Sequence, residues 1–200
     1  MLLNSEEIRS FVAIELPEEV KNRLVRLRGG LERKEHAFVK WVEPGGIHLT
    51  LKFLGNISPE LVTEITRAIK ESSEGISPFR LELSGLGAFP NLKQPRVVWV
   101  GIYGEVDKLL RLQHNVDSAL ISLGFAKEER PFTPHLTLAR IKQGAPFTQL
   151  KNFGELVMSS NFEREYSFEV KTVDLMRSQL TPKGAIYTRI SVVELRAQNK

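Results

Sequence analysis

The chain has 200 residues, 42% of them hydrophobic, and a formal net charge of +4 at pH 7 with a pI near 9.4. This size and apolar content predict one globular domain, residues 1–200, and the mild basicity is compatible with a polyanionic partner. The absence of cysteine excludes disulfides, thiolate metal sites and a cysteine nucleophile.

The sequence predicts neither a membrane span nor a secretory signal. No apolar run reaches the length of a span, and residues 1–10 carry Glu6, Glu7 and Arg9 without a long apolar region. We therefore expect a cytoplasmic protein that contacts no membrane, and a monomer by default.

Strands and helices follow one another in mixed order in the first half of the chain. Pro17 opens a predicted helix over about 18–31, and Ser58 caps a second helix that extends to about residue 72. The predicted strands are bounded by turn residues and cover residues 9–16, 39–42, 48–55, 79–83 and 97–103.

The second half contains an amphipathic helix at 105–123, ended by Gly124, and a short helix at 148–153. Its predicted strands include the segment around His135 and residues 166–177 and 185–195. Several strands follow one another without an intervening helix, which indicates an α+β fold with antiparallel sheets. No glycine-rich dinucleotide loop or P-loop follows a strand.

The tetrapeptide His-Leu-Thr-Leu occurs twice, at residues 48–51 and 135–138. Side chains two residues apart in a strand share a face, so His48 and Thr50 point one way while the intervening leucines point into a core. The same holds for His135 and Thr137. A single strand histidine is more often structural than catalytic, but a duplicated pair favours a catalytic role.

The spacing of 87 residues between the two histidines recurs along the chain. Residues 9–13 fall on 96–100 at this offset, and residues 79–83 fall on 166–170. Such a constant offset predicts a duplicated unit, about 9–89 and 96–176, with a C-terminal strand completing the sheets. We expect a bilobal, pseudo-twofold α+β fold with two antiparallel sheets lining a central cleft and helices outside.

Two facing imidazoles suit paired acid and base roles, one neutral and one protonated. The threonine hydroxyls can donate hydrogen bonds to the nonbridging oxygens of a phosphate. One histidine would remove a proton from water and the other would protonate the departing sugar oxygen. Two histidines on separate strands without clustered carboxylates make a poor metal site, so we expect neither metal nor cofactor.

Several segments together resemble the RNA 2',3'-cyclic phosphodiesterases, or 2'-5' RNA ligase family, among the two-histidine (2H) phosphoesterases. The resemblance covers nearly the whole chain and rests on residues 9–17, 48–55, 87–90, 95–99, 130–140 and 178–187. It implies a bilobal fold with both motifs lining the cleft. It also implies metal-independent opening of a terminal 2',3'-cyclic phosphate to a 2'-phosphate, and ATP-independent joining of tRNA halves through a 2'-5' bond.

The resemblance also implies roles for the motif residues. His48 and His135 would be the acid and base, in an order that the sequence does not decide, and Thr50 and Thr137 would bind the phosphate. RNA ends with a 2',3'-cyclic phosphate, such as tRNA halves, would be the partners.

Other residues could support the site, and some of them have two interpretations. Arg130 could contact a phosphate or be an exposed loop charge. Phe11 could stack on a terminal base or pack in a second core. Trp99 is expected in the core, and His36 and His114 on the surface. The basic residues of the first predicted helix could be a solvated face or could contact a phosphate backbone.

Two other functions remain compatible with the sequence. The same chemistry could act on a small cyclic phosphate, such as an ADP-ribose cyclic phosphate. The chain could instead be a noncatalytic RNA- or nucleotide-binding module, although binding alone does not require two proton-transfer groups.

Overall fold

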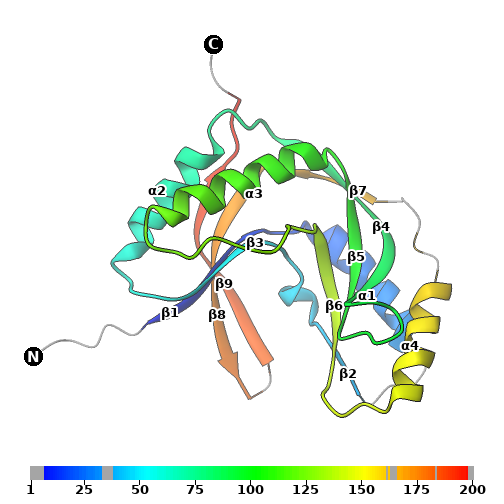
Figure 1. The fold of residues 1–200 in the computed structure, drawn as a ribbon. Coiled ribbons are helices and arrows are strands. Elements are labelled where there is room, and N and C mark those ends of the chain that lie inside the picture. The colour runs from blue at the N-terminus through cyan, green and yellow to red at the C-terminus, as the bar shows by residue number, and fades with distance from the viewer. Residues whose placement is uncertain (1–6, 33–37, 161, 163–165, 183, 198–200) are drawn as a thin grey trace, which may run out of the picture.

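Two antiparallel sheets form the framework of the computed structural model (Figure 1), which describes residues 7–32, 38–160, 162, 166–182 and 184–197. The first sheet has the strand order β3 (Leu49–Ile57), β1 (Ile8–Ile14), β8 (Thr172–Thr181) and β9 (Gly184–Glu194). The second has the order β2 (Val39–Trp41), β6 (His135–Ile141), β5 (Val97–Gly104), β4 (Phe79–Phe89) and β7 (Tyr166–Val170). The predicted α+β class with antiparallel sheets is confirmed.

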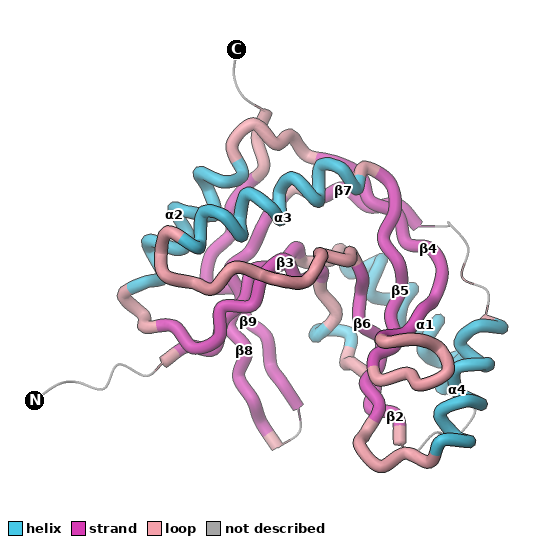
Figure 2. Tube along the Cα trace, in the orientation of Figure 1, coloured by secondary structure: helices cyan, strands magenta, loops and turns pink. Residues whose placement is uncertain are grey.

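Helices pack on the outer side of each sheet. Helices α2 (Leu61–Ser73) and α3 (Val106–Ile121) contact each other and strands β9 and β3, whereas α4 (Phe147–Ser159) contacts β4. Helix α1 (Glu18–Glu32) contacts the 3-10 turn η1 (Pro44–Gly46), as Figures 1 and 2 show. None of the helices in the described ranges is long and apolar enough to cross a membrane.

The two sheets correspond to each other as the repeat predicts, but strands are exchanged between them, since β2 also lies in the second sheet and β9 in the first. The order β3-β1-β8 in the first sheet corresponds to β6-β5-β4 in the second. Strand β4 comes from the first half of the sequence but lies in the second sheet, and β8 from the second half lies in the first sheet. Each sheet is therefore built from both halves of the chain.

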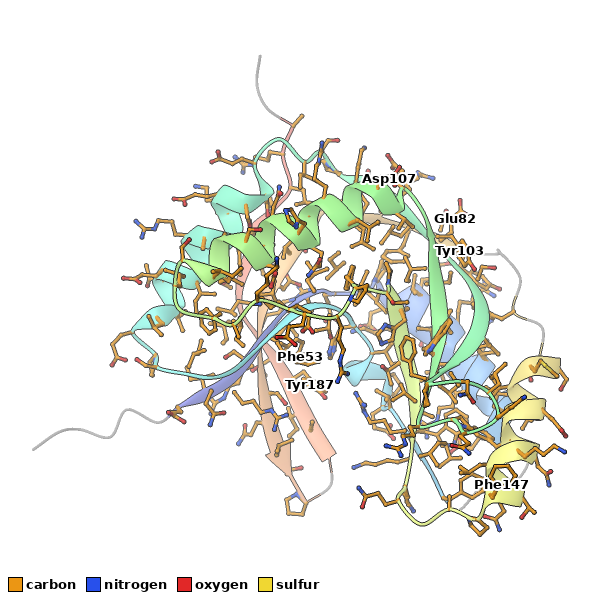
Figure 3. The ribbon with its side chains drawn as sticks, in the orientation of Figure 1. Phe53, Glu82, Tyr103, Asp107, Phe147 and Tyr187 are labelled. Atoms are coloured by element: carbon orange, nitrogen blue, oxygen red, sulfur yellow. The ribbon has the colours of Figure 1, made fainter. Side chains whose placement is uncertain are left out.

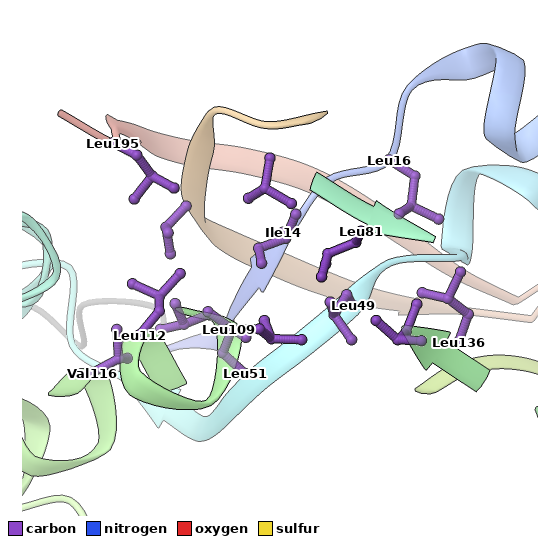
Figure 4. Close-up of a cluster of buried hydrophobic side chains, with 14 of the residues drawn as sticks. Ile14, Leu16, Leu49, Leu51, Leu81, Leu109, Leu112, Val116, Leu136 and Leu195 are labelled. Atoms are coloured by element: carbon purple, nitrogen blue, oxygen red, sulfur yellow. The ribbon is translucent and has the colours of Figure 1, made fainter. Parts of the chain in front are cut away.

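One hydrophobic cluster joins both sheets and α1, α2 and α3 (Figure 4). The leucines of both tetrapeptides belong to it: Leu49 and Leu136 are 0% exposed, Leu51 4% and Leu138 1%. Burying a leucine contributes about 1.5–3 kcal/mol. These leucines anchor both motif strands in the same core and leave the histidine and threonine on the opposite face.

Four predicted elements differ from the structure, among them the strand predicted at 79–83, which extends to Phe89 as β4. The predicted strand at 166–177 is two strands, because β7 pairs with β4 while β8 pairs with β1, and the chain changes sheets at Lys171. Helix α2 begins at Leu61, since Ser58 and Pro59 form a tight turn in which the Leu61 amide bonds the Ser58 carbonyl. The short helix predicted at 148–153 extends to Ser159.

Candidate active site

Each motif strand contains a β-bulge at the same place. In β3, Thr50 pairs with Ala13 and Lys52 with Val12, so Leu51 has no partner. In β6, Thr137 pairs with Trp99 and Ala139 with Val98, so Leu138 likewise has no partner in β5. Leu51 and Leu138 are 87 residues apart. A bulge adds one residue to a strand and shifts the alternation of faces by one position.

The bulge places a third side chain on each motif face. Leu51 and Lys52 are both buried, so the next residue, Phe53, shares the face of His48 and Thr50, and it is 68% exposed. By the same count Arg140 shares the face of His135 and Thr137. Thus the motif face reads His, Thr, Phe in the first half and His, Thr, Arg in the second.

His48 lies directly before β3 and is enclosed by aromatic rings. Its ring centroid is 4.6 Å from that of Phe11 and 5.0 Å from that of Tyr187. The turn η1, which precedes His48, packs closely against Tyr187, since a Cβ at Gly46 would lie 3.0 Å from the tyrosine ring. Tyr187 and Phe53 lie near the centre of the molecule in Figure 3, away from Phe147 on α4.

This enclosure keeps His48 uncharged. Burial, together with the positive charge of Lys21, lowers the pKa of His48 from 6.5 to about 4. Lys21 is itself buried, in an ion pair with Glu15. The Nδ1 atom of His48 is also buried and has no hydrogen-bond partner among the described residues. At pH 7 the ring is neutral.

His135 opens β6 and has a defined tautomer. Its Nδ1 lies 2.7 Å from the carbonyl oxygen of Thr133. A carbonyl only accepts hydrogen bonds, so we assign the proton of the neutral ring to Nδ1, which leaves the lone pair on Nε2. The ring contacts Phe89 at 4.9 Å and Trp99 at 6.4 Å between centroids.

The threonines of both motifs are half-buried and stand two residues after their histidines on the same face. Thr50 pairs across the sheet with Ala13, and Thr137 pairs with Trp99. The predicted alternation of the tetrapeptides is therefore confirmed, with His48 itself just outside the strand.

The supporting residues lie as follows. Phe11 is 2% exposed and packs in a small cluster with Ala13, Met176 and Tyr187, on the opposite face of β1 from the main core. Its ring supports His48, so the stacking role on a base stays a prediction, and Phe53 is the accessible ring on that face. Arg130 is exposed in the segment before β6.

The expectation that Trp99 packs in the core is wrong. Val98 and Val100 are fully buried, and Trp99 between them points to the opposite, motif face, beside Phe89 and His135. Gly87 makes room for it, since a Cβ there would lie 2.3 Å from the indole ring. His114 is exposed on α3 as expected, and His36 lies outside the described residues.

A buried ion pair connects the two motifs. Lys52, two residues after Thr50, pairs with Asp117 of α3 and donates a hydrogen bond of 2.7 Å to the carbonyl of Ala126. The backbone amide of Glu128 reaches the same carboxylate at 3.4 Å. Figure 2 shows this segment, which leads to β6, running from the end of α3 across β3. The first motif strand therefore helps to position the approach to His135.

Sequence reasoning did not identify Tyr187, Phe89 or Lys21 as neighbours of the histidines. Phe89 and Tyr187 had a signal, because they lie in the segments 87–90 and 178–187 that carry the family resemblance, whereas Lys21 had none. No group of three or more histidine, cysteine, aspartate or glutamate side chains in the described part of the chain could hold a metal ion.

Comparison of the chain with known protein families gives a class of phosphoesterases and repeats the duplication seen in the fold. A family model described as LigT like phosphoesterase matches the chain twice, over residues 14–99 and 100–187. The chain belongs to this LigT-like phosphoesterase family, as the resemblance implied.

Relatives and solved structures are similar over almost the full length. The RNA 2',3'-cyclic phosphodiesterase of Methanothermobacter thermautotrophicus is 34% identical over 94% of this chain and 100% of its own. That of Aeropyrum pernix is 38% identical over 86% and 94%. The structure of TT0787 from Thermus thermophilus is 31% identical with a TM-score of 0.77, covering 96% of this chain and 100% of its own. E. coli LigT complexed with 3'-AMP is 25% identical with a TM-score of 0.76, over 95% and 99%.

Proposed function

We propose that this chain hydrolyses a terminal 2',3'-cyclic phosphate of RNA to a 2'-phosphate, without a metal ion. The observation that carries this proposal is a repeated arrangement. A histidine, a threonine and a β-bulge lie at equivalent places in two sheets that share a core. The names of several relatives, RNA 2',3'-cyclic phosphodiesterase, support the substrate.

The protonation state of His48 in the free protein supports its assignment as the base. His48 is neutral at pH 7, because its pKa is about 4, and it would accept a proton from the attacking water. An acid with that pKa would be protonated in only about one molecule in a thousand at pH 7. His135 would therefore be the acid in its doubly protonated form, giving the proton of Nε2 while Nδ1–H stays on the Thr133 carbonyl.

The step balances with these two groups. Water attacks phosphorus and a new P–O bond forms while its proton passes to His48. The bond from phosphorus to O3' breaks, and O3' takes the proton from His135. Thr50 and Thr137 would donate hydrogen bonds to the nonbridging oxygens, and Arg130 would add a positive charge. With the 5'-hydroxyl of a second RNA end in place of the attacking water, and O3' still leaving, the same step would give the 2'-5' bond of the ligation.

Aromatic residues near His48 would serve the nucleoside. The exposed ring of Phe53 is available to stack on the terminal base, a contact worth about 1–3 kcal/mol. Phe11, buried beneath, would hold the imidazole in place.

The test is incubation of the purified protein with EDTA and an RNA oligonucleotide that ends in a 2',3'-cyclic phosphate. We expect a 2'-phosphate product, formed at least about a hundredfold more slowly with His48→Ala. A 3'-phosphate would contradict the assigned leaving oxygen, and loss of activity in EDTA would contradict metal independence. If the RNA is not hydrolysed, ADP-ribose cyclic phosphate is the next substrate to test.

A further inference from the structure

A carboxylate lies across the sheet from the imidazole of His48. Strand β1 ends at Ile14, which pairs with Leu49 of β3. Continuing this register by one residue places Glu15 opposite His48, just beyond the ends of both strands. Ile14 and Leu49 belong to the main hydrophobic cluster, so by alternation Glu15 and His48 both point to the motif face. Side chains opposite each other in antiparallel strands are close enough to interact.

Lys21 of α1 binds this carboxylate. The lysine is buried, and its ammonium forms an ion pair with Glu15, whose side chain is also mostly buried. A second carboxylate, that of Glu18, lies 3.4 Å from the same ammonium but is exposed to solvent. Because the Nδ1 atom of His48 has no hydrogen-bond partner among the described residues, the carboxylate opposite it binds the lysine instead of that nitrogen.

The elements around His48 carry other charged or titratable groups, which are Tyr187 and Arg189 of β9, Asp174 of β8, and Glu43 before η1. Asp174 is the cross-strand partner of Ala13 and is fully buried, and the Nε atom of Arg189 lies 3.1 Å from its carboxylate. Burial raises the pKa of Asp174, and the charge of Arg189 opposes that rise. Glu43 is exposed and pairs with Arg28. Each of these carboxylates therefore has a cation of its own.

The second half places a different residue beside its histidine. The cross-strand partner of His135 is Gly101, which has no side chain. Lys108 lies 87 residues after Lys21, but it is partly exposed and pairs with Glu105 at the start of its own helix. The lysine–carboxylate pair is thus buried next to the histidine in the first half and lies at the surface in the second.

A buried ion pair contributes little net stability, because the loss of hydration offsets most of the attraction. Its place beside one imidazole therefore indicates a role in the chemistry. An uncovered carboxylate opposite His48 would favour the charged imidazolium, which cannot accept a proton. We propose that Lys21 is a positioning residue for the reaction, which holds the Glu15 carboxylate so that His48 stays free to take the proton of the attacking water. This proposal rests on the proposed function, in which His48 is the base.

The first test is titration of the histidine rings by NMR, with the His48 signal assigned by its loss in His48→Gln. Lys21→Met uncovers the carboxylate, and we expect the pKa of His48 to rise from about 4 by about one pH unit. Lys21→Arg keeps the positive charge and should leave this pKa near its parent value. Glu15→Gln/Lys21→Met removes the carboxylate as well and should reverse most of the rise.

Lys108→Met is the matched control, because it removes the equivalent lysine of the second half, and it should leave the pKa of His48 unchanged. Lys21→Gln can still donate a hydrogen bond to Glu15, should shift the pKa in the same direction, and decides the question if Lys21→Met does not fold. An unchanged pKa in the folded variant, the same rise in the control, or the full rise in the double variant would overturn the proposal.

The second test is the pH dependence of kcat/KM on an RNA that ends in a 2',3'-cyclic phosphate. In Lys21→Met the acid limb should move to higher pH by the amount that NMR gives for His48, because this limb reports the base of the free enzyme. A loss of activity that is equal at every pH would show a structural role and would overturn the proposal. If the pKa rises as expected but the parent protein does not hydrolyse the RNA, it is the proposed function that fails.

Discussion

The two halves of this protein present the same backbone motif in different surroundings. In the first half, the imidazole of His48 is enclosed by Phe11 and Tyr187, and its pKa is lowered to about 4. In the second, His135 bonds a carbonyl through Nδ1. Three residues beyond the motif threonine, the first half has exposed Phe53 and the second has Arg140 beside Lys40.

This difference teaches how a duplicated fold becomes an asymmetric site. The bulge and the buried leucines are shared, because they set the backbone and the faces. The side chains around them diverged. Under the proposed function, the first half holds the neutral base and the nucleobase, and the second half donates the proton.

The largest expected effect comes from removing either imidazole. His48→Ala and His135→Ala should each lower kcat by about 10²–10⁴-fold, because each removes a proton-transfer group. Circular dichroism should show that both variants remain folded. If one variant keeps near-normal activity, only one half of the repeat is catalytic and the paired mechanism is wrong.

Among the structural variants, loss of the buried Lys52–Asp117 ion pair should lower the free energy of unfolding the most. Lys52→Met leaves the buried carboxylate of Asp117 unpaired and should lower the free energy of unfolding by about 3–5 kcal/mol. The double variant Lys52→Met/Asp117→Leu should recover part of it, and Lys70→Met on the surface of α2 should change little. Urea unfolding gives the free energy of unfolding of the three variants. If Lys52→Met were as stable as Lys70→Met, the ion pair would not be a structural link.

The low pKa of His48 makes the first half sensitive to acid. Because this pKa lies below the ordinary value of 6.5, the unfolded chain binds the proton more tightly than the folded one. The stability it contributes is complete above pH 6.5 and is lost as the pH falls from 6.5 towards 4, by up to about 3 kcal/mol.

Replacing the histidines separates this effect from other acid-sensitive groups. His48→Gln should lose less stability between pH 6.5 and 4 than the parent, whereas His135→Gln should retain the loss caused by His48. Thermal unfolding at a series of pH values provides the comparison. Identical pH dependence in the parent and His48→Gln would show that His48 is not held neutral by the fold.

The smallest expected effect tests how tightly each half packs around its histidine. Gly87→Ala forces Trp99 to move and should cost about 1–3 kcal/mol, with a change in tryptophan fluorescence. Gly46→Ala presses on Tyr187 less severely and should cost less. Gly45→Ala, with open space around it, is the control. A melting temperature of Gly87→Ala equal to that of the control would contradict the close packing of Trp99.

Much of the fold and site could be predicted because the signals are local. Alternation in the tetrapeptides correctly placed the leucines in the core, and the offset of 87 residues revealed the duplication. Trp99 was misplaced because a strand buried on one face and a strand covered on both faces show similar apolar runs. The strand at 166–177 was not divided because a change of pairing partner leaves no mark in hydrophobic pattern.

The sequence by itself determined the motifs, their duplication and the class of chemistry, since these depend on residue types and spacing. Only the tertiary structure decided the exchange of β4 and β8 between sheets, because strand partners are chosen by contacts distant in the chain. It also decided the matching bulges that bring Phe53 and Arg140 to the motif faces. Finally, it distinguished the two histidines, because a pKa depends on burial and nearby charge, which are properties of the packed molecule.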